Sequence, residues 1–212
     1  MIYPISNVHI YGIDEAVRAS KFPKSVNVDT CSPAITEMTK RLGSCKVGSG
    51  HDQMLTGITA IFDLTFSIKA WTEAERYTFL NFISSQSTVW CITKFDIEKQ
   101  CNEYVDKRII EIVKEKVDKY NSLLQEKETV TYSVVDAEEL DRKIKEAYLN
   151  ILYNVPTGFM LTASMVTNYR ALKTIYFQRH NHKLPEWRLF CSQVLQFPKF
   201  DELCMYKPNQ LT

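Results

Sequence analysis

The chain has 212 residues, 45% of them hydrophobic, which is enough for one large domain or two small ones with a sizeable core. Its formal net charge is +1, whereas proteins that coat nucleic acids usually carry a clear basic excess. The N-terminus lacks a charged segment followed by an apolar one, and no apolar stretch approaches the roughly 18 residues of a membrane span. We therefore expect a cytoplasmic protein that contacts neither membranes nor nucleic acids directly.

Six cysteines and four histidines are spread along the chain without the paired spacing of a zinc site. His180 and His182 form an H-x-H pair, but on a helix their rings would splay apart by about 200°. The pattern favours free thiols in a reducing compartment and no metal site.

The N-terminal part of the chain is expected to contain short elements. Residues 8–11 are predicted to form a strand and residues 14–20 a short helix. Ser32 and Pro33 are typical of a helix start, because serine caps free N–H groups and proline suits the first turn. We expect this helix to run to about Leu42.

The next segments combine a glycine-rich turn with the clearest strand. Residues 46–51 lack the spacing of a phosphate-binding loop and are expected to form a turn. Residues 58–70 alternate apolar and polar side chains and are rich in β-branched and aromatic types, which predicts a strand. Thr72 and Glu75 match a capping box, which predicts a helix over about 73–83.

A run of small hydrogen-bonding side chains follows, namely Ser84, Ser85, Gln86 and Ser87. Such a run usually forms a polar turn. It also suits an oxygen-rich ligand, because hydroxyl and backbone N–H groups crowd closely there. Both interpretations stay open.

Two strongly charged segments occupy the middle of the chain. Residues 98–125 repeat apolar side chains every three or four positions, which predicts a long amphipathic helix with solvated outer faces. A little strand is expected at 130–135, and a cap pattern at 136–139 predicts a helix to about Leu152. We expect a charged helical hairpin over about 98–152.

A helix is expected over about 163–180, with polar residues along the edge of its apolar stripe. At about 100° per residue, Asn168 and Arg179 lie within roughly 60° of the stripe and about 16 Å apart. That spacing suits a ligand of nucleotide size, although both side chains could instead snorkel at the rim of the core. A last helix is expected over 186–195, with an extended tail from Pro198. The stripe consists of Met165, Tyr169, Leu172 and Tyr176.

The side chains around this helix suit a phosphate and an aromatic ring. Arginine chelates phosphate through two N–H groups, amide and hydroxyl groups read the edge of a uracil or flavin ring, and aromatic side chains stack on its face. A serine nucleophile lacks an elbow motif such as G-x-S-x-G. The set consists of Arg76, the serine run, Asn168, Tyr169, Arg170 and Arg179.

At these residues the chain resembles the flavin-dependent thymidylate synthases. A Val-Pro pair ending at Pro156, an N-x-R-x-L motif beginning at Asn168, the later Arg179 and an E-x-R motif beginning at Glu186 occur in the family's order. The resemblance implies that Asn168 and Arg170 contact the flavin. It implies that Arg179 contacts the phosphate or the base of a nucleotide.

The family's signature, R-H-R-x-x-S-x-N-x-x-S-x-R-Y, is altered here. One register places Arg76, Asn81 and Ser84 on its third arginine, its asparagine and its second serine. An ungapped register places Arg76 on an upstream arginine and loses the signature. The resemblance implies flavin contacts at His51 and Asn81. It implies nucleotide contacts at Arg76, Ser84, Ser85, Gln86, Ser87 and Arg179.

The resemblance extends to a group of phage and prophage proteins of this superfamily, through blocks such as G-S-G-H-D and N-Y-R-x-L-K-T. It implies an α+β fold, with a small mainly antiparallel sheet packed with long helices, as one thymidylate synthase-like domain over 1–212 that assembles as a homotetramer. It implies an enzyme that binds FAD and a pyrimidine deoxynucleotide such as dUMP. Such an enzyme alters carbon 5 of the base with a one-carbon unit from reduced folate or another donor.

Two other functions stay open. A nucleotide-binding scaffold that has lost its catalytic arginines would act as a sensor, sequestering or regulatory module of a phage. A purely structural helical oligomer would bind no ligand. The first of these keeps the nucleotide contacts and loses only the chemistry, because fold alone does not carry function.

Overall fold

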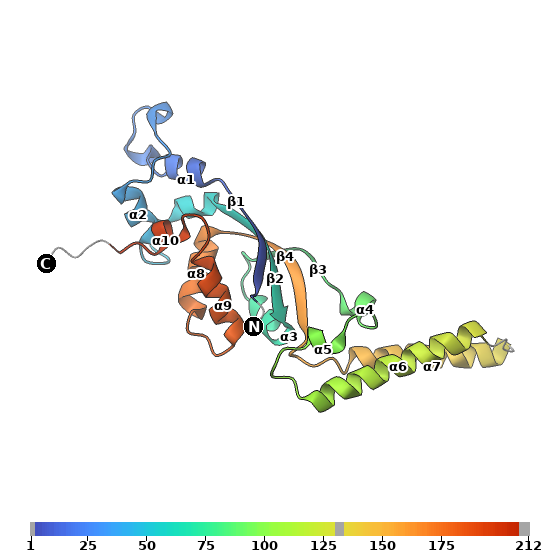
Figure 1. Cartoon of the computed structure of the whole chain (residues 1–212). Helices are drawn as coiled ribbons and strands as arrows, with labels where there is room; N and C mark the ends of the chain where they lie inside the picture. Colours follow the sequence, from blue (N-terminus) through green and yellow to red (C-terminus); the bar gives the residue numbers. More distant parts are fainter. Residues whose placement is uncertain (1–2, 130–133, 208–212) are drawn as a thin grey trace. The chain divides into compact units, whose positions relative to one another are not determined.

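The computed structural model describes residues 3–129 and 134–207, which form an α+β structure around a small antiparallel four-stranded sheet (Figure 1). Strands β1 (Ile5–Tyr11) and β2 (Thr59–Ser67) pair antiparallel, with Ile5 opposite Leu64 and Tyr11 opposite Thr59. The predicted fold class is confirmed. The strand order in the sheet is β1 (Ile5–Tyr11), β2 (Thr59–Ser67), β4 (Met160–Asn168) and β3 (Asn81–Ser85).

The described residues contain helices of very different lengths, and none of these helices is both long and apolar enough to cross a bilayer. The α-helices are α1 (Ile13–Ala19), α2 (Glu37–Ser44), α3 (Ile68–Ala74), α4 (Thr88–Cys91), α5 (Ile97–Gln100), α6 (Lys107–Thr129), α7 (Val134–Leu152), α8 (Tyr169–Arg179), α9 (Pro185–Val194) and α10 (Phe200–Cys204). The 3-10 helices are η1 (Phe22–Lys24), η2 (Val28–Thr30) and η3 (Gln53–Gly57).

The chain divides into two compact units, of which the first comprises Met1–Thr65, Thr72–Ser84 and Thr162–Thr212. Its core lies on the apolar face of β2, where the alternation predicted from the sequence is observed as alternating burial. Phe62 on that face packs against the rings of Phe190 and Phe197. These contacts hold α9 and the segment after it against the sheet.

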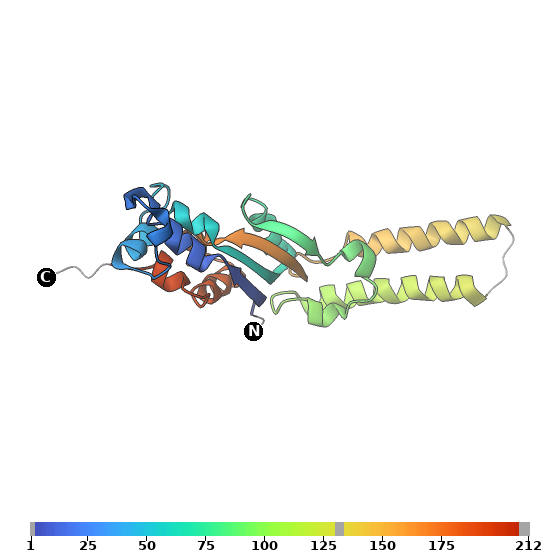
Figure 2. The same ribbon diagram turned by 90° about the horizontal axis from the view of Figure 1, so that it is seen from above.

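The second unit comprises Phe66–Trp71 and Ser85–Leu161. Figure 2 shows α6 and α7 running side by side, and the rings of Tyr120 and Tyr148 meet between them at 5.1 Å. The range predicted for the charged hairpin therefore contains two paired helices, whose bounds differ from the predicted ones. The stretch before α6 forms the separate helix α5, and Val134 opens α7, while 130–133 lie outside the described residues. The buried core of the second unit consists of Ile92, Ile97, Ile110, Val113, Val117, Ile151 and Phe159.

The first part of the helix expected over 163–180 is wrong, because β4 continues to Asn168 and α8 begins at the next residue. Ala163, Met165 and Thr167 are buried in alternation, as the two-residue period of a strand requires. Asn168 ends the strand and caps the helix, with its Oδ1 accepting the N–H of Ala171 at 3.0 Å. Met165 therefore belongs to no helical stripe, and Asn168 lies at the helix start rather than beside one.

The helix expected over 73–83 is also wrong. Helix α3 begins directly after β2, where the hydroxyl of Ser67 accepts the N–H of Ala70 at 3.1 Å, and it ends at Ala74. Strand β3 then follows at Asn81–Ser85 as an exposed edge strand. The capping-box pattern at Thr72 and Glu75 therefore straddles the end of a helix that had already begun.

Two further boundaries differ from the predictions. Helix α2 begins at Glu37 rather than near Pro33, because Thr36 and Thr39 cap it reciprocally. In the tail from Pro198, Phe200–Cys204 form α10 instead of an extended surface segment. This helix buries Phe200 in the core, where its ring centre lies 5.1 Å from that of Tyr169.

Candidate functional site

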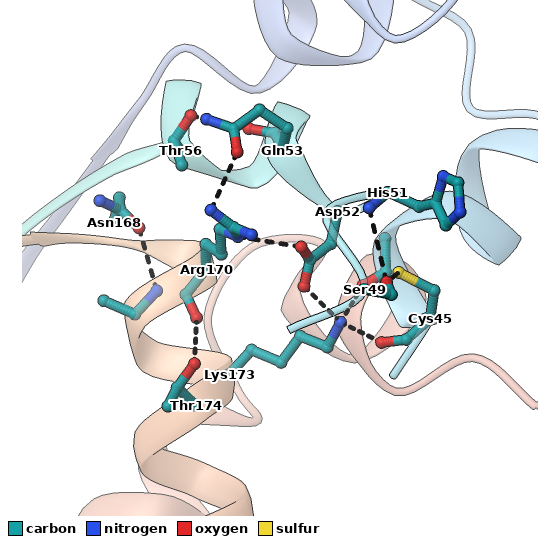
Figure 3. Close-up of polar contacts among 12 residues, drawn as sticks. Cys45, Ser49, His51, Asp52, Gln53, Thr56, Asn168, Arg170, Lys173 and Thr174 are labelled. Carbon is teal, nitrogen blue, oxygen red and sulfur yellow. Dashed lines mark hydrogen bonds and ion pairs between the residues drawn. The ribbon is translucent and has the colours of Figure 1, made fainter. Parts of the chain in front are cut away.

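A buried ion pair connects η3 to α8 (Figure 3). The side chain of Lys173 is 0% exposed and that of Asp52 is 1% exposed, with Nζ and Oδ2 at 2.9 Å. The same ammonium donates to the backbone carbonyls of Gly43 at 2.8 Å and Cys45 at 2.5 Å. All three N–H groups of Lys173 therefore have acceptors, which is the condition for burying a cation at tolerable cost.

Arg170 shares the same carboxylate from the more exposed side. Its Nε donates to Oδ1 of Asp52 at 2.9 Å, and its Nη1 donates to Oε1 of Gln53 at 2.9 Å. Burial disfavours ionisation of Asp52, but the hydrogen bonds and charges of Lys173 and Arg170 outweigh it and hold the pKa of Asp52 below its usual value. One carboxylate thus faces two cations, and the excess positive charge reaches the surface at Arg170, whose side chain is 32% exposed.

A cavity of about 270 Å³ lies at the start of α8. Asn168, the N-cap of α8, and Arg170, in its first turn, line this cavity together with Tyr77 and Phe79. Its size falls just below the range of about 300–1,000 Å³ for small-molecule sites, so it fits one ring system better than a whole dinucleotide. The remaining lining consists of Val47, Gly48, Asp52, Thr56, Leu80, Ala171, Thr174 and Ile175.

Arg179 lies at the far end of α8 in a cluster of its own. Its Nε donates to the hydroxyl of Tyr77 at 2.7 Å, and its Nη1 donates to Oε2 of Glu73 at 3.1 Å. The guanidinium carbon lies 5.4 Å from the ring centre of Tyr77 and 5.1 Å from that of Trp187. The side chain is 13% exposed, so this is a largely desolvated cation with both an anionic and an aromatic environment.

His182 is the second donor to the carboxylate of this cluster. Its Nε2 lies 3.1 Å from Oε2 of Glu73, while its Nδ1 accepts the backbone N–H of Leu184 at 3.2 Å. Because Nδ1 accepts a hydrogen bond, Nε2 is assigned as the nitrogen that donates to Glu73. The carboxylate of Glu73 thus contacts both Arg179 and His182.

The structure brings two of the proposed flavin contacts together, since Asn168 and Arg170 line one cavity. Tyr77 connects this cavity to the cluster of Arg179. His51 is exposed and lines a different cavity of about 1440 Å³. Thr56 lines both cavities, and Gln53, which accepts a hydrogen bond from Arg170, lines the larger one.

The other residues expected at the site lie outside the small cavity. Arg76 is exposed in the turn after α3. Asn81 and Ser84 lie on the exposed edge strand β3. The three remaining members of the run belong to the second unit, where they end β3 and lead into α4. They are Ser85, Gln86 and Ser87.

Sequence reasoning missed the anions that hold the two arginines, Asp52 and Glu73. It also missed Lys173, although a signal was present. Lys173 comes four residues after Tyr169 and three before Tyr176, so it lies on the apolar face of the helix. A lysine on that face indicates a buried acceptor elsewhere in the chain. No group of three or more histidine, cysteine or acidic residues in the described part of the chain could hold a metal ion.

No protein-family model matches the chain, and no curated protein matches it either. Two crystal structures of the flavin-dependent thymidylate synthase of Helicobacter pylori, each with FAD and dUMP, are similar in fold. One has a TM-score of 0.63 at 14% identity and covers 93% of this chain and 96% of its own. The other has a TM-score of 0.64 at 15% identity and covers 92% and 95%. The chain therefore has the fold of the flavin-dependent thymidylate synthases.

Replacing Lys173 with methionine should lower the free energy of unfolding by about 3–5 kcal/mol, because half of a buried ion pair is removed. The carbonyls of Gly43 and Cys45 also lose their donor. Urea denaturation measures the loss. Lys183→Met removes an exposed lysine just after α8 and should change stability by no more than about 0.5 kcal/mol. Equal losses in the two variants would contradict the importance of the buried pair.

The low pKa of Asp52 also predicts how stability depends on pH. Its ionised form stabilises the fold above the unfolded pKa of about 3.9, and this contribution is lost as the pH falls through the lower folded pKa. Asp52→Asn should be less stable than the parent at pH 7 and should lose less stability between about pH 5 and pH 2. Urea midpoints across this range measure both profiles. Parallel profiles would show that Asp52 makes no such contribution.

Proposed function

We propose that this chain binds a flavin in the cavity at the start of α8 and a pyrimidine deoxynucleotide close to it, and that it alters carbon 5 of the pyrimidine. The observation that carries the proposal is the meeting of Asn168 and Arg170 in one cavity, in a fold whose solved examples contain FAD and dUMP. The one-carbon unit would come from reduced folate or another donor. The reaction would belong to the cytoplasm, of a host cell if the chain is phage-encoded.

The residues present suit a flavin. The amide Nδ2 of Asn168 and the Nη2 of Arg170 have no hydrogen-bond partner among the described residues, so both can donate to a ring carbonyl or a phosphate. Phe79, Leu80 and Ile175 supply the apolar wall that a ring face needs. A bound flavin would supply the hydride or one-carbon chemistry, which side chains cannot supply.

The chain's own contribution is orientation. Asp52 fixes the Nε edge of Arg170, and Gln53 fixes Nη1, so the guanidinium reaches the cavity in one direction. A donor that is already held loses less conformational entropy when a ligand arrives. The buried Lys173 keeps Asp52 in place, so it acts on the ligand through two other residues.

We further propose a homotetramer in which a second copy completes the site. The cavity holds one ring system, whereas FAD and a nucleotide together need far more surface. Exposed candidates on each copy would then be available to its neighbour. They are His51, Arg76, Asn81, Ser84, Ser85 and Gln86, together with the half-buried Ser87. Light scattering should give about four times 24.6 kDa, and a particle of 24.6 kDa would contradict the shared site.

A nucleotide-binding protein without catalysis is the second candidate. The altered signature favours it, because the signature arginines are incomplete in this chain. The purified protein distinguishes the two. Denaturation should release FAD from a yellow enzyme, identified by absorbance and mass. A colourless protein that binds dUMP would favour the binding module, and a colourless one that binds neither would leave only the structural alternative.

Arg179→Ala should weaken binding of dUMP by about 2 kcal/mol or more, on the scale of a charge-assisted hydrogen bond to a desolvated cation. Arg179→Lys should recover only part of the loss, because an ammonium cannot form the two-pronged contact. Calorimetric titration measures both. Arg142→Ala is the control, since that arginine is 57% exposed on α7. If folded Arg179→Ala binds dUMP like the parent, Arg179 does not contact the nucleotide and only packs at the edge of the core.

A further inference from the structure

The guanidinium of Arg179 is already engaged on the edges that a phosphate would use. A phosphate binds arginine best through two parallel N–H groups. Here Nη1 donates to Glu73 and Nε donates to Tyr77, at 3.1 and 2.7 Å. An incoming phosphate would also meet the negative charge of Glu73 at close range, where repulsion in a poorly solvated site is strong. Phosphate binding at Arg179 therefore requires a change of partner.

Glu73 is a mostly buried part of this cluster and not an exposed surface residue. Its side chain is 19% exposed, and it accepts hydrogen bonds from His182 as well as from Arg179. The rings of Tyr77 and Trp187 pack against the same guanidinium and against each other at 5.7 Å. This environment reduces screening by water, so the internal pair is worth more than an exposed one.

We propose that Glu73 is a resident anion of the Arg179 site, which competes with the phosphate of a nucleotide for the guanidinium. The proposal rests on the proposed function, because it assumes that a pyrimidine nucleotide binds next to Arg179. Glu73 then determines specificity: it reduces the advantage of a nucleoside monophosphate over the uncharged nucleoside. His182 offers the displaced carboxylate a donor, so Glu73 can leave Arg179 without losing every partner.

The test compares dUMP with deoxyuridine by calorimetric titration of the complete chain. Glu73→Gln keeps the size and an acceptor oxygen but removes the charge. It should bind dUMP about tenfold more tightly than the parent, which corresponds to about 1.4 kcal/mol, and should bind deoxyuridine unchanged. Glu75→Gln removes an equal charge from an exposed position two residues later and should behave like the parent. Thermal unfolding verifies that each variant is folded.

A double variant tests whether the gain in dUMP binding depends on Arg179. In an Arg179→Gln background, Glu73→Gln should no longer improve dUMP binding, because the contested cation is gone. If Glu73→Gln binds dUMP no better than the parent, or Glu75→Gln gains equally, the competition is refuted while the proposed function stands. If the parent and all variants fail to bind dUMP, the proposed function fails and this inference falls with it.

Discussion

The contact between Lys173 and Asp52 joins two distant segments of the first unit beside the small cavity. It links residues 121 positions apart and places the N-terminal η3 against the C-terminal α8. Burying two charges is costly, and the cost is offset here because the ammonium also reaches two backbone carbonyls and the carboxylate also reaches Arg170. The interaction that holds two segments together therefore also positions the arginine at the mouth of the cavity.

The two arginines of α8 differ in how much of their positive charge is paired with carboxylates. Around Arg170, one carboxylate is shared by two cations, so positive charge remains available to an anionic ligand. Around Arg179, the carboxylate of Glu73 faces a single arginine and the ring of His182, so the charge of this arginine is already paired. Two arginines on one helix thus differ in how far their positive charge is compensated by the protein itself.

Much of the fold could be read from local patterns. The alternation along β2 and the three-to-four spacing of the hairpin are strong periodic signals, because each reflects one buried face. The sequence predicts a helix over part of β4, since Met165, Tyr169, Leu172 and Tyr176 recur at helical spacing. Asn168 was the missed boundary signal: asparagine favours the N-cap, where its oxygen binds a free N–H group. The burial of Phe200 depends on tertiary packing, which no local pattern reveals.

The residues of the candidate site likewise divide into those that a local motif predicts and those that it does not. Asn168 and Arg170 were found because their motif is contiguous in the sequence. Their setting was not, because Asp52 lies 118 residues from Arg170 and Glu73 lies 106 residues from Arg179. A single sequence gives the arginines but not the anions that hold them. The lysine on the apolar face of α8 was the only local sign that a buried carboxylate existed.

We propose that a charge network built around a buried ion pair presents Arg170 to a flavin at the start of α8. A crystal structure of the protein with FAD and dUMP tests it most directly. We expect the flavin in contact with Asn168 and Arg170, with Asp52 still bound to Lys173. A flavin bound elsewhere, or a cavity filled by the protein's own side chains while FAD is bound at another surface, would contradict the account.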